Sequence, residues 1–139
     1  MRALCSYDYA IVRVVPRVER EEFINAGVIV SCPAKDFLEA RIALDESRLL
    51  ALDPAVDLAL VRTHLASIPA ICAGGEAAGS LGKLSARERF HWLVAPRSTI
   101  IQVSPAHAGR ATDPREALEH LLARMVQQGI STGTRGSAG

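Results

Sequence analysis

Residues 7–44 read YDYAIVRVVPRVEREEFINAGVIVSCPAKDFLEARIAL, and this stretch decides the fold class. Residues 7–15 are rich in β-branched and aromatic side chains and stop at a proline, which is typical of a strand. Residues 27–32 predict a second strand, and residues 37–44 predict a third because apolar and polar side chains alternate there. A short turn joins these two strands as a hairpin. Residues 18–27 predict a short helix or turn that begins with acidic side chains.

Helical segments and one more strand follow. Residues 53–69 begin with an Asp-Pro pair and carry apolar side chains at helical spacing. Residues 85–94 begin with the capping-box pattern S-x-x-E, which favours a helix, although alternating apolar residues also allow a strand. Residues 98–104 (STIIQVS) predict the fourth strand. Residues 113–129 predict the last helix, because an Asp-Pro start precedes an apolar stripe and a closing glycine.

The order of these segments predicts an α+β domain. Because the strands come first as a group, we expect a mainly antiparallel sheet of about four strands with helices packed on one face. The domain is predicted over residues 1–130, and the low-complexity residues 131–139 are predicted to be a disordered tail. The Gly-rich residues 73–83 predict a flexible linker, because their Lys lacks the spacing of a phosphate-binding loop.

The composition argues against several classes of protein. The chain is 49% hydrophobic with a net charge of only +1, which is atypical of a protein that binds nucleic acid through bulk charge. Cys5, Cys32 and Cys72 are far apart, which predicts neither a zinc site nor a disulfide framework but reduced thiols in the cytoplasm. No apolar run approaches the roughly 20 residues that cross a bilayer. We find no motif for a cofactor or a metal.

The side chains that suggest chemistry concentrate in residues 85–113. Arg97, Ser98 and Thr99 resemble an anion grip, because a guanidinium binds two oxygens at once. An ordinary turn with a solvated Arg97 explains the triplet equally well. His107 is expected in the loop after the fourth strand, where it could act as acid, base or anion donor. A loop histidine that bonds only to backbone is the favoured interpretation, because no partner nucleophile is identifiable.

Strand alternation also gathers polar side chains on the sheet face away from the helices. That face would display Tyr9, Arg13, Glu39, Arg41 and Gln102. Tyr and Arg are typical anchors of protein interfaces, so this face is a candidate interface. A solvated ladder of ion pairs is the alternative, and it is slightly favoured.

Three segments resemble the bacterial domain-of-unknown-function family 3037: YDYAIVRVVPRVEREEFINAGVIVSCP (7–33), RFHWLVAPRSTIIQVSPAHAG (89–109) and DPREALEHLLARMV (113–126). The family-like residues are Phe23, Asn25, Gly27, Phe90, Trp92, Pro96, Arg97, Ser98, His107 and Gly109. The resemblance implies a small cytosolic bacterial protein without an established activity or catalytic residues. Members of the family are often encoded beside a kinase resembling the HipA toxin, which implies a shared pathway or complex.

These observations favour a non-enzymatic accessory protein that binds a protein partner, such as a HipA-like kinase. Binding would use the open sheet face or the segment from Arg97 to His107. The alternative is a small enzyme or ligand-binding protein for a phosphate-bearing substrate, in which Arg97 grips the anion and His107 is the acid or base. Convergence of Arg97, Ser98 and His107 in one pocket would favour that alternative. The sequence leaves self-association open.

Overall fold

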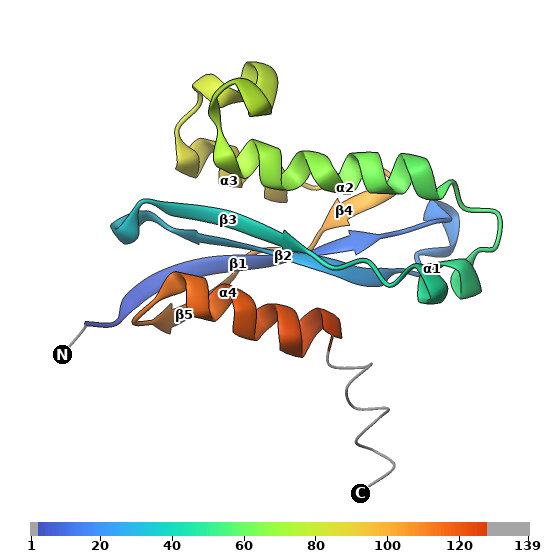
Figure 1. Cartoon of the computed structure of the whole chain (residues 1–139), viewed down its shortest axis with the longest axis horizontal. Helices are drawn as coiled ribbons and strands as arrows, with labels where there is room; N and C mark the ends of the chain where they lie inside the picture. The colour runs from blue at the N-terminus through green and yellow to red at the C-terminus, as the bar shows by residue number, and fades with distance from the viewer. Residues whose placement is uncertain (1–2, 128–139) are drawn as a thin grey trace, which may run out of the picture.

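A five-stranded antiparallel sheet forms the centre of the protein, which we describe from a computed structural model (Figure 1). The strands are β1 (Cys5–Val14), β2 (Ile24–Cys32), β3 (Phe37–Ile42), β4 (Ile101–Val103) and β5 (His107–Ala111). The structure describes residues 3–127, so the predicted helix end at Gly129 and the predicted tail lie outside the described residues. The α+β class and the antiparallel sheet are confirmed, with one strand more than expected.

The long strand β1 organises the sheet. It pairs along its length with β2, and β3 follows β2 at the edge. On its other side, β1 pairs with β4 near its end, at Val12–Val14, and with β5 near its start, at Cys5–Tyr9. The strand predicted over residues 98–104 is therefore present as the shorter β4, and β5 is an additional strand that was not predicted. The chain turns between them at the buried Ser104, whose hydroxyl accepts a hydrogen bond from the Ile11 N–H at 2.9 Å.

The hairpin from β1 to β2 differs from its prediction. Only Val18–Arg20 form a short 3-10 turn, which ends at Glu21 in the left-handed conformation (φ 57°). Strand β2 already begins at Ile24, so Gly27 lies inside the strand and does not follow a helix. A Cβ at Gly27 would lie 2.7 Å from the Arg41 carbonyl oxygen, which explains the glycine by close packing against β3.

The helices are α1 (Glu46–Leu52), α2 (Leu58–Ala73), α3 (Ala86–Val94) and α4 (Pro114–Leu122), which continues as a π-helical turn over Ala123–Gln127. The helix predicted from residue 53 begins later, because Asp57 caps α2 by accepting the Leu60 N–H, and a separate helix α1 precedes it. The helical prediction for residues 85–94 is confirmed, with both capping-box bonds between Ser85 and Glu88. The predicted linker at residues 73–83 forms 3-10 turns, Gly75–Lys83.

Helices cover both faces of the sheet, whereas one face was predicted. Helices α2 and α3 pack on one face, and α4 packs on the other (Figure 1). Strands β1 and β2 explain this arrangement, because their side chains are apolar on both sides: Val12 and Ile29 face α2, while Ile11 and Val28 face α4. Central strands that are apolar on both faces must be covered on both.

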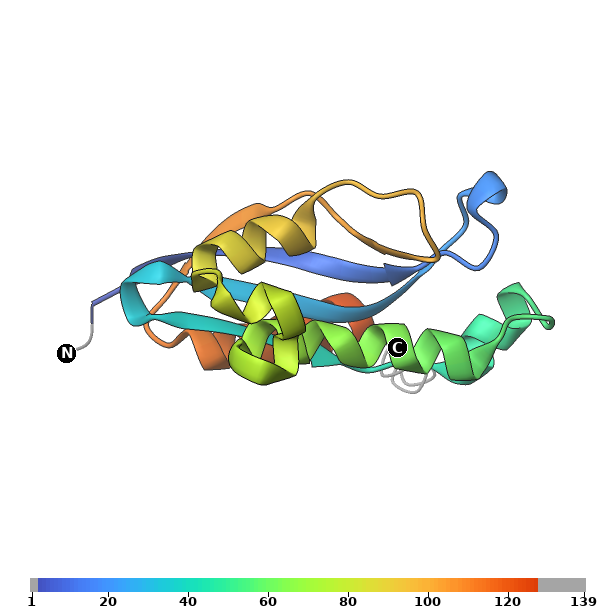
Figure 2. The same ribbon diagram turned by 90° about the horizontal axis from the view of Figure 1, so that it is seen from above.

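Seen from above, α2 runs along the β3 edge of the sheet (Figure 2). Among the residues that the structure describes, no single helix is both long and apolar enough to cross a membrane. Helix α2 and Gly75–Lys83, which meet at a bend of 74°, together reach the required length and apolar composition, by these two properties alone.

Candidate functional site

Four of the predicted site residues meet in one hollow at the end of the sheet where β4 pairs with β1. Arg13, Arg97, Ser98 and Gln102 line this hollow, whose volume is about 360 Å³. Val15, Val18, Glu21 and Phe23 complete its lining. Pairing brings Arg13 directly opposite Gln102, so both side chains leave the same face of the sheet, as strand alternation predicted.

Arg13 projects from β1 beside a β-bulge in the pairing with β2. Its guanidinium lies 4.4 Å from the centre of the Phe23 ring, in a cation–π stack. Within residues 3–127, its Nε is buried without a hydrogen-bond partner. Phe23 itself is 44% exposed. The stack therefore holds a cation and an aromatic ring together at the surface, and Glu21 is the single acidic side chain among the described residues of the lining.

Arg97 plays a structural part that neither sequence interpretation anticipated. Its terminal nitrogens donate to the carbonyl oxygens of Trp92 at 2.6 Å, Leu93 at 3.1 Å and Ala95 at 3.3 Å. A cation is favourable there, because the carbonyls at a helix C-terminus lack partners within the helix. The guanidinium also lies 4.2 Å from the centre of the Trp92 ring, which is 42% exposed.

A second, smaller hollow of about 150 Å³ shares Arg97 with the first. Trp92, His64 and Thr99 line it beside apolar residues of α2 and β4. The Thr99 hydroxyl donates to the Ile101 carbonyl oxygen at 2.8 Å, so this third member of the predicted anion grip is turned to its own backbone. We call the combined area the Arg13–Arg97 surface. It consists of Arg13, Phe23, Trp92, Arg97, Ser98 and Gln102.

His107 does not join this surface. It opens β5, where a loop had been predicted, and pairs with Tyr9 near the start of β1. The two rings lie 5.4 Å apart, and His107 is exposed. Because β4 pairs with the end of β1 and β5 with its start, Arg97 and His107 lie toward opposite ends of that strand. The convergence of Arg97, Ser98 and His107 in one pocket, which a phosphate-acting enzyme would need, is not found among the described residues.

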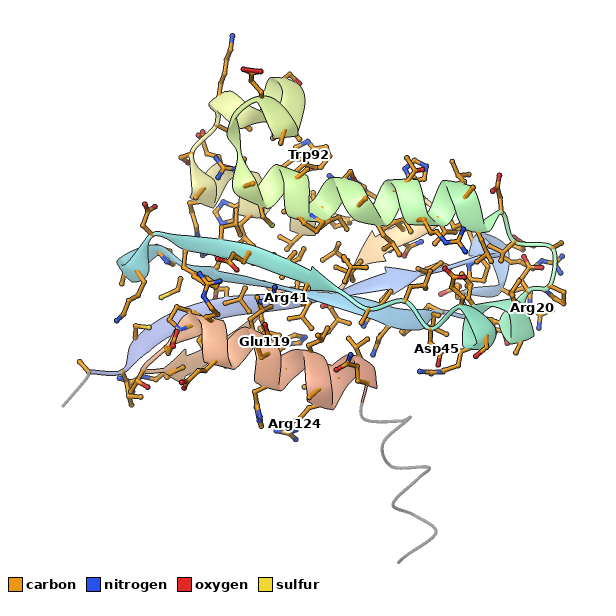
Figure 3. All side chains as sticks on the ribbon, in the orientation of Figure 1. Arg20, Arg41, Asp45, Trp92, Glu119 and Arg124 are labelled. Atoms are coloured by element: carbon orange, nitrogen blue, oxygen red, sulfur yellow. The ribbon has the colours of Figure 1, made fainter. Side chains whose placement is uncertain are left out.

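The other predicted interface residues are partly exposed and lie against α4, so the sheet face is not open in this part of the sheet. Arg115 of α4 donates a hydrogen bond to Glu39 at 2.9 Å and forms an ion-pair contact with its second carboxylate oxygen at 2.8 Å. Arg41 and Glu119 point toward each other and form a second ion pair between β3 and α4 (Figure 3). Tyr9 packs half-buried against the apolar cluster under α4. Glu39 and Arg41 thus form ion pairs with α4 and remain partly exposed to solvent.

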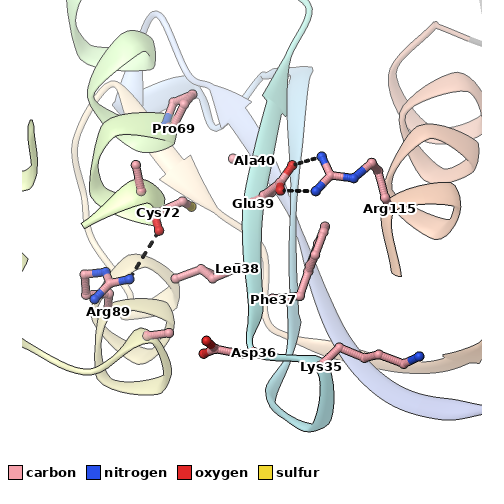
Figure 4. A pocket seen from close by; sticks show the side chains of 12 residues that line it. Lys35, Asp36, Phe37, Leu38, Glu39, Ala40, Pro69, Cys72, Arg89 and Arg115 are labelled. Carbon is pink, nitrogen blue, oxygen red and sulfur yellow. Dashed lines mark hydrogen bonds and ion pairs between the residues drawn. The ribbon is translucent and has the colours of Figure 1, made fainter. Parts of the chain in front are cut away.

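No pattern in the sequence indicated a larger hollow, about 650 Å³, beside strand β3 (Figure 4). Strand β3 lies between Pro69, Cys72 and Arg89 on one side and Arg115 on the other. The Arg89 guanidinium donates to the carbonyl oxygens of Ile71, Cys72 and Leu84, and so fixes the end of α2. These bonds occupy all three nitrogens of Arg89, so it is a structural residue here.

The cysteine thiols are buried. Burial raises the pKa of Cys72 to about 12, against a smaller opposing effect of the Arg89 charge. Burial likewise raises the pKa of Cys32, whose Sγ lies 3.3 Å from that of Cys5. A thiol with a raised pKa is a poor nucleophile at neutral pH. Across residues 3–127, no three His, Cys, Asp or Glu side chains are grouped as metal ligands.

Comparison with known proteins gives one match. A family model described as "Protein of unknown function (DUF3037)" matches residues 9–126. No curated protein and no solved structure matches the chain. The matched range contains the whole Arg13–Arg97 surface and most of the sheet.

Proposed function

The chain belongs to this family of proteins of unknown function (DUF3037), and from that premise we propose that it is a non-enzymatic accessory protein that binds a protein partner through the Arg13–Arg97 surface. The observation that supports this proposal is the pair of arginine–aromatic stacks with exposed rings, Arg13 on Phe23 and Arg97 on Trp92. Trp and Arg are among the residues most enriched at the positions that dominate binding energy in protein interfaces.

The surface has the chemistry that an acidic partner segment would recognise. Arg13 forms no ion pair within residues 3–127, and its Nε is already withdrawn from water. A carboxylate of the partner would pair with the remaining Arg13 guanidinium nitrogens in a charge-assisted hydrogen bond. Stacking on Phe23 limits the freedom of the Arg13 side chain, so less conformational entropy is lost when the partner binds.

We propose a HipA-like kinase as this partner and the cytoplasm as the place where the two meet. The support for the kinase is the resemblance described above, because members of the family are often encoded beside such a kinase. The support for the cytoplasm is the use of cysteine, with three separated thiols and no disulfide among the described residues.

The test is a pull-down of the co-encoded kinase, followed by titration calorimetry with the purified pair. Arg13→Glu should weaken binding at least tenfold, about 1.4 kcal/mol or more, because it places a like charge against the acidic segment. Phe23→Ser should weaken binding through loss of the stack without adding a repulsive charge. Arg48→Glu on α1 is the matched control, because Arg48 is exposed and lies outside the surface.

Each result decides one part of the proposal. A kinase that fails to bind the wild-type chain rejects the kinase as partner. A kinase that binds Arg13→Glu and Arg48→Glu equally well rejects the surface. Circular dichroism of each variant shows that a loss of binding does not come from unfolding.

The alternative function, action on a phosphate-bearing ligand, retains one supporting observation: two guanidinium groups line the same hollow. Its proposed acid or base has no such support, because His107 lies outside that hollow. Titration with a phosphate monoester would show saturable binding that Arg13→Glu abolishes if the alternative holds, and no heat of binding if it does not.

A further inference from the structure

Strand β3 has β2 as its neighbour on one side and forms an edge of the sheet on the other. The Ala43 N–H donates to the Ala26 carbonyl oxygen at 2.8 Å, in register with the pairing of β2 and β3. Peptide groups alternate in direction along an antiparallel strand, so those of residues 37, 39 and 41 also face β2. Those of Leu38, Ala40 and Ile42 face away from the sheet and find no partner strand among the described residues.

The space beside this edge is the 650 Å³ hollow, which lies between the end of α2 and Arg115 (Figure 4). Lysine, proline, a bulge or a covering loop usually protects the edge of a sheet from pairing. The stretch from Leu38 to Ile42 contains neither Lys nor Pro, and its pairing with β2 is regular, without a bulge. Its charged side chains, Glu39 and Arg41, are turned to α4.

We propose that β3 pairs antiparallel with β3 of a second copy of the chain, about a two-fold axis at Ala40, so that the two sheets become continuous. In this register Ala40 lies opposite Ala40 of the second copy, and Leu38 lies opposite Ile42. All three outward-facing residues of each strand then have partners. This pairing concerns the opposite side of the sheet from the Arg13–Arg97 surface, so it does not depend on the proposed function.

Charge selects this register over its neighbours. With Ala40 on the axis, Glu39 of each copy lies opposite Arg41 of the other, so two pairs of opposite charge form. Outward-facing residues are two positions apart, so the pairing of the two strands can shift only in steps of two residues. A shift of two residues moves the two-fold axis by one residue, to Glu39 or to Arg41. Those registers bring Glu39 against Glu39 or Arg41 against Arg41, and like charges directly opposite each other destabilise a sheet.

The existing ion pairs fit the same arrangement. Arg115 binds Glu39 and Glu119 binds Arg41 within one chain. Across the axis, these groups would continue as a row of alternating charges on the α4 side. On the α2 side, the half-buried Ile42 would gain an apolar neighbour, the Leu38 of the second copy. A second copy is therefore complementary to this edge in both charge and polarity.

The first test measures the mass of the full chain by light scattering and sedimentation equilibrium over a range of concentrations. The wild-type chain should have twice the monomer mass. Ala40→Pro should raise the dimer dissociation constant at least tenfold, because it removes an outward N–H that no bond within the monomer uses. Ala40→Gly is the matched control, because it keeps this N–H. A wild-type chain that stays monomeric, or a dimer that Ala40→Pro leaves intact, overturns the proposal.

The second test uses charge and cannot be imitated by a folding defect. In Glu39→Arg, the introduced arginine lies opposite Arg41 of the other copy, and in Arg41→Glu, the introduced glutamate lies opposite Glu39. Each variant alone should therefore be mainly monomeric. An equimolar mixture of the two variants should form a heterodimer, because each arginine then faces a glutamate. Absence of the heterodimer overturns the register. Ala40→Pro should still bind the kinase like the wild-type chain, which separates this proposal from the proposed function.

Discussion

The two faces of the sheet are stabilised in different ways. Within residues 3–127, the face under α2 and α3 buries fourteen apolar residues in one cluster, whereas the face under α4 buries seven, so the first contributes more to folding. The second face adds two ion pairs from β3 to α4. A single helix cannot cover the whole second face, and the uncovered end carries Arg13 and Gln102. The Arg13 half of the Arg13–Arg97 surface therefore lies on the less strongly packed face, whereas Trp92 belongs to α3 on the other face.

The largest effect is expected on the α2–α3 face. Phe90 of α3 is 1% exposed and belongs to the larger cluster. Phe90→Ala should lower the free energy of unfolding by about 3–5 kcal/mol, because it removes a large buried side chain and leaves a cavity. Urea denaturation followed by circular dichroism measures this loss. A loss below about 2 kcal/mol would contradict the dominance of this face.

A smaller effect is expected on the α4 face. Leu118 is fully buried in the smaller cluster. Leu118→Ala should lower the free energy of unfolding by about 2–3 kcal/mol, because α4 has fewer buried neighbours and its end can adjust to the cavity. Hydrogen exchange in the variant should become faster in α4 than in α2. Equal acceleration in both helices would show that the two faces unfold as one unit.

A pH dependence sharpens the comparison further, because burial on the α2–α3 face raises the pKa of Cys72 from an ordinary value of 9.0 to about 12. A raised thiol pKa contributes stability that is fully present below pH 9 and is lost as the pH rises through 12. From about pH 8 to about pH 10.5, the free energy of unfolding of the wild-type chain should fall by about 2 kcal/mol more than that of Cys72→Ala. This difference follows from a slope of about 1.4 kcal/mol per pH unit above about pH 9. Urea denaturation at both pH values under reducing conditions measures this difference. An equal loss of unfolding free energy in the two proteins would contradict the raised pKa of Cys72 as the cause.

Local signals predicted most of the helices and strands. The capping box at Ser85 and the Asp113-Pro114 start both place their helices correctly, because a cap is formed within four residues of sequence. Strand β5 was missed because HAGRA, residues 107–111, has no β-branched side chain, and its pairing with β1 is the interaction that makes it a strand. The side on which α4 packs also depends on distant residues, which no local pattern contains.

The candidate site shows the same limit. Arg97 and His107 are near in sequence and were grouped, but the turn at Ser104 sends β5 toward the start of β1. Arg13 and Arg97 are far apart in sequence and were assigned to different sites, yet the pairing of β4 with β1 brings them into one hollow. Phe23 was noted only as a family-like residue, because no rule of spacing predicts that an aromatic side chain outside the strands will stack on a cation from β1.

The smallest effect is expected for the ion pair between Glu39 and Arg115, which tests whether charge or apolar contact holds α4 on its face. The Glu39 and Arg115 side chains are 33% and 58% exposed, so water screens their attraction despite the bidentate geometry. A double-mutant cycle with Glu39→Gln and Arg115→Gln should give a coupling free energy of about 0.2–1 kcal/mol, less than the loss in Leu118→Ala. High salt should reduce this coupling and leave the effect of Leu118→Ala unchanged. A coupling as large as the loss in Leu118→Ala would mean that ion pairs, and not the seven buried residues, hold this helix.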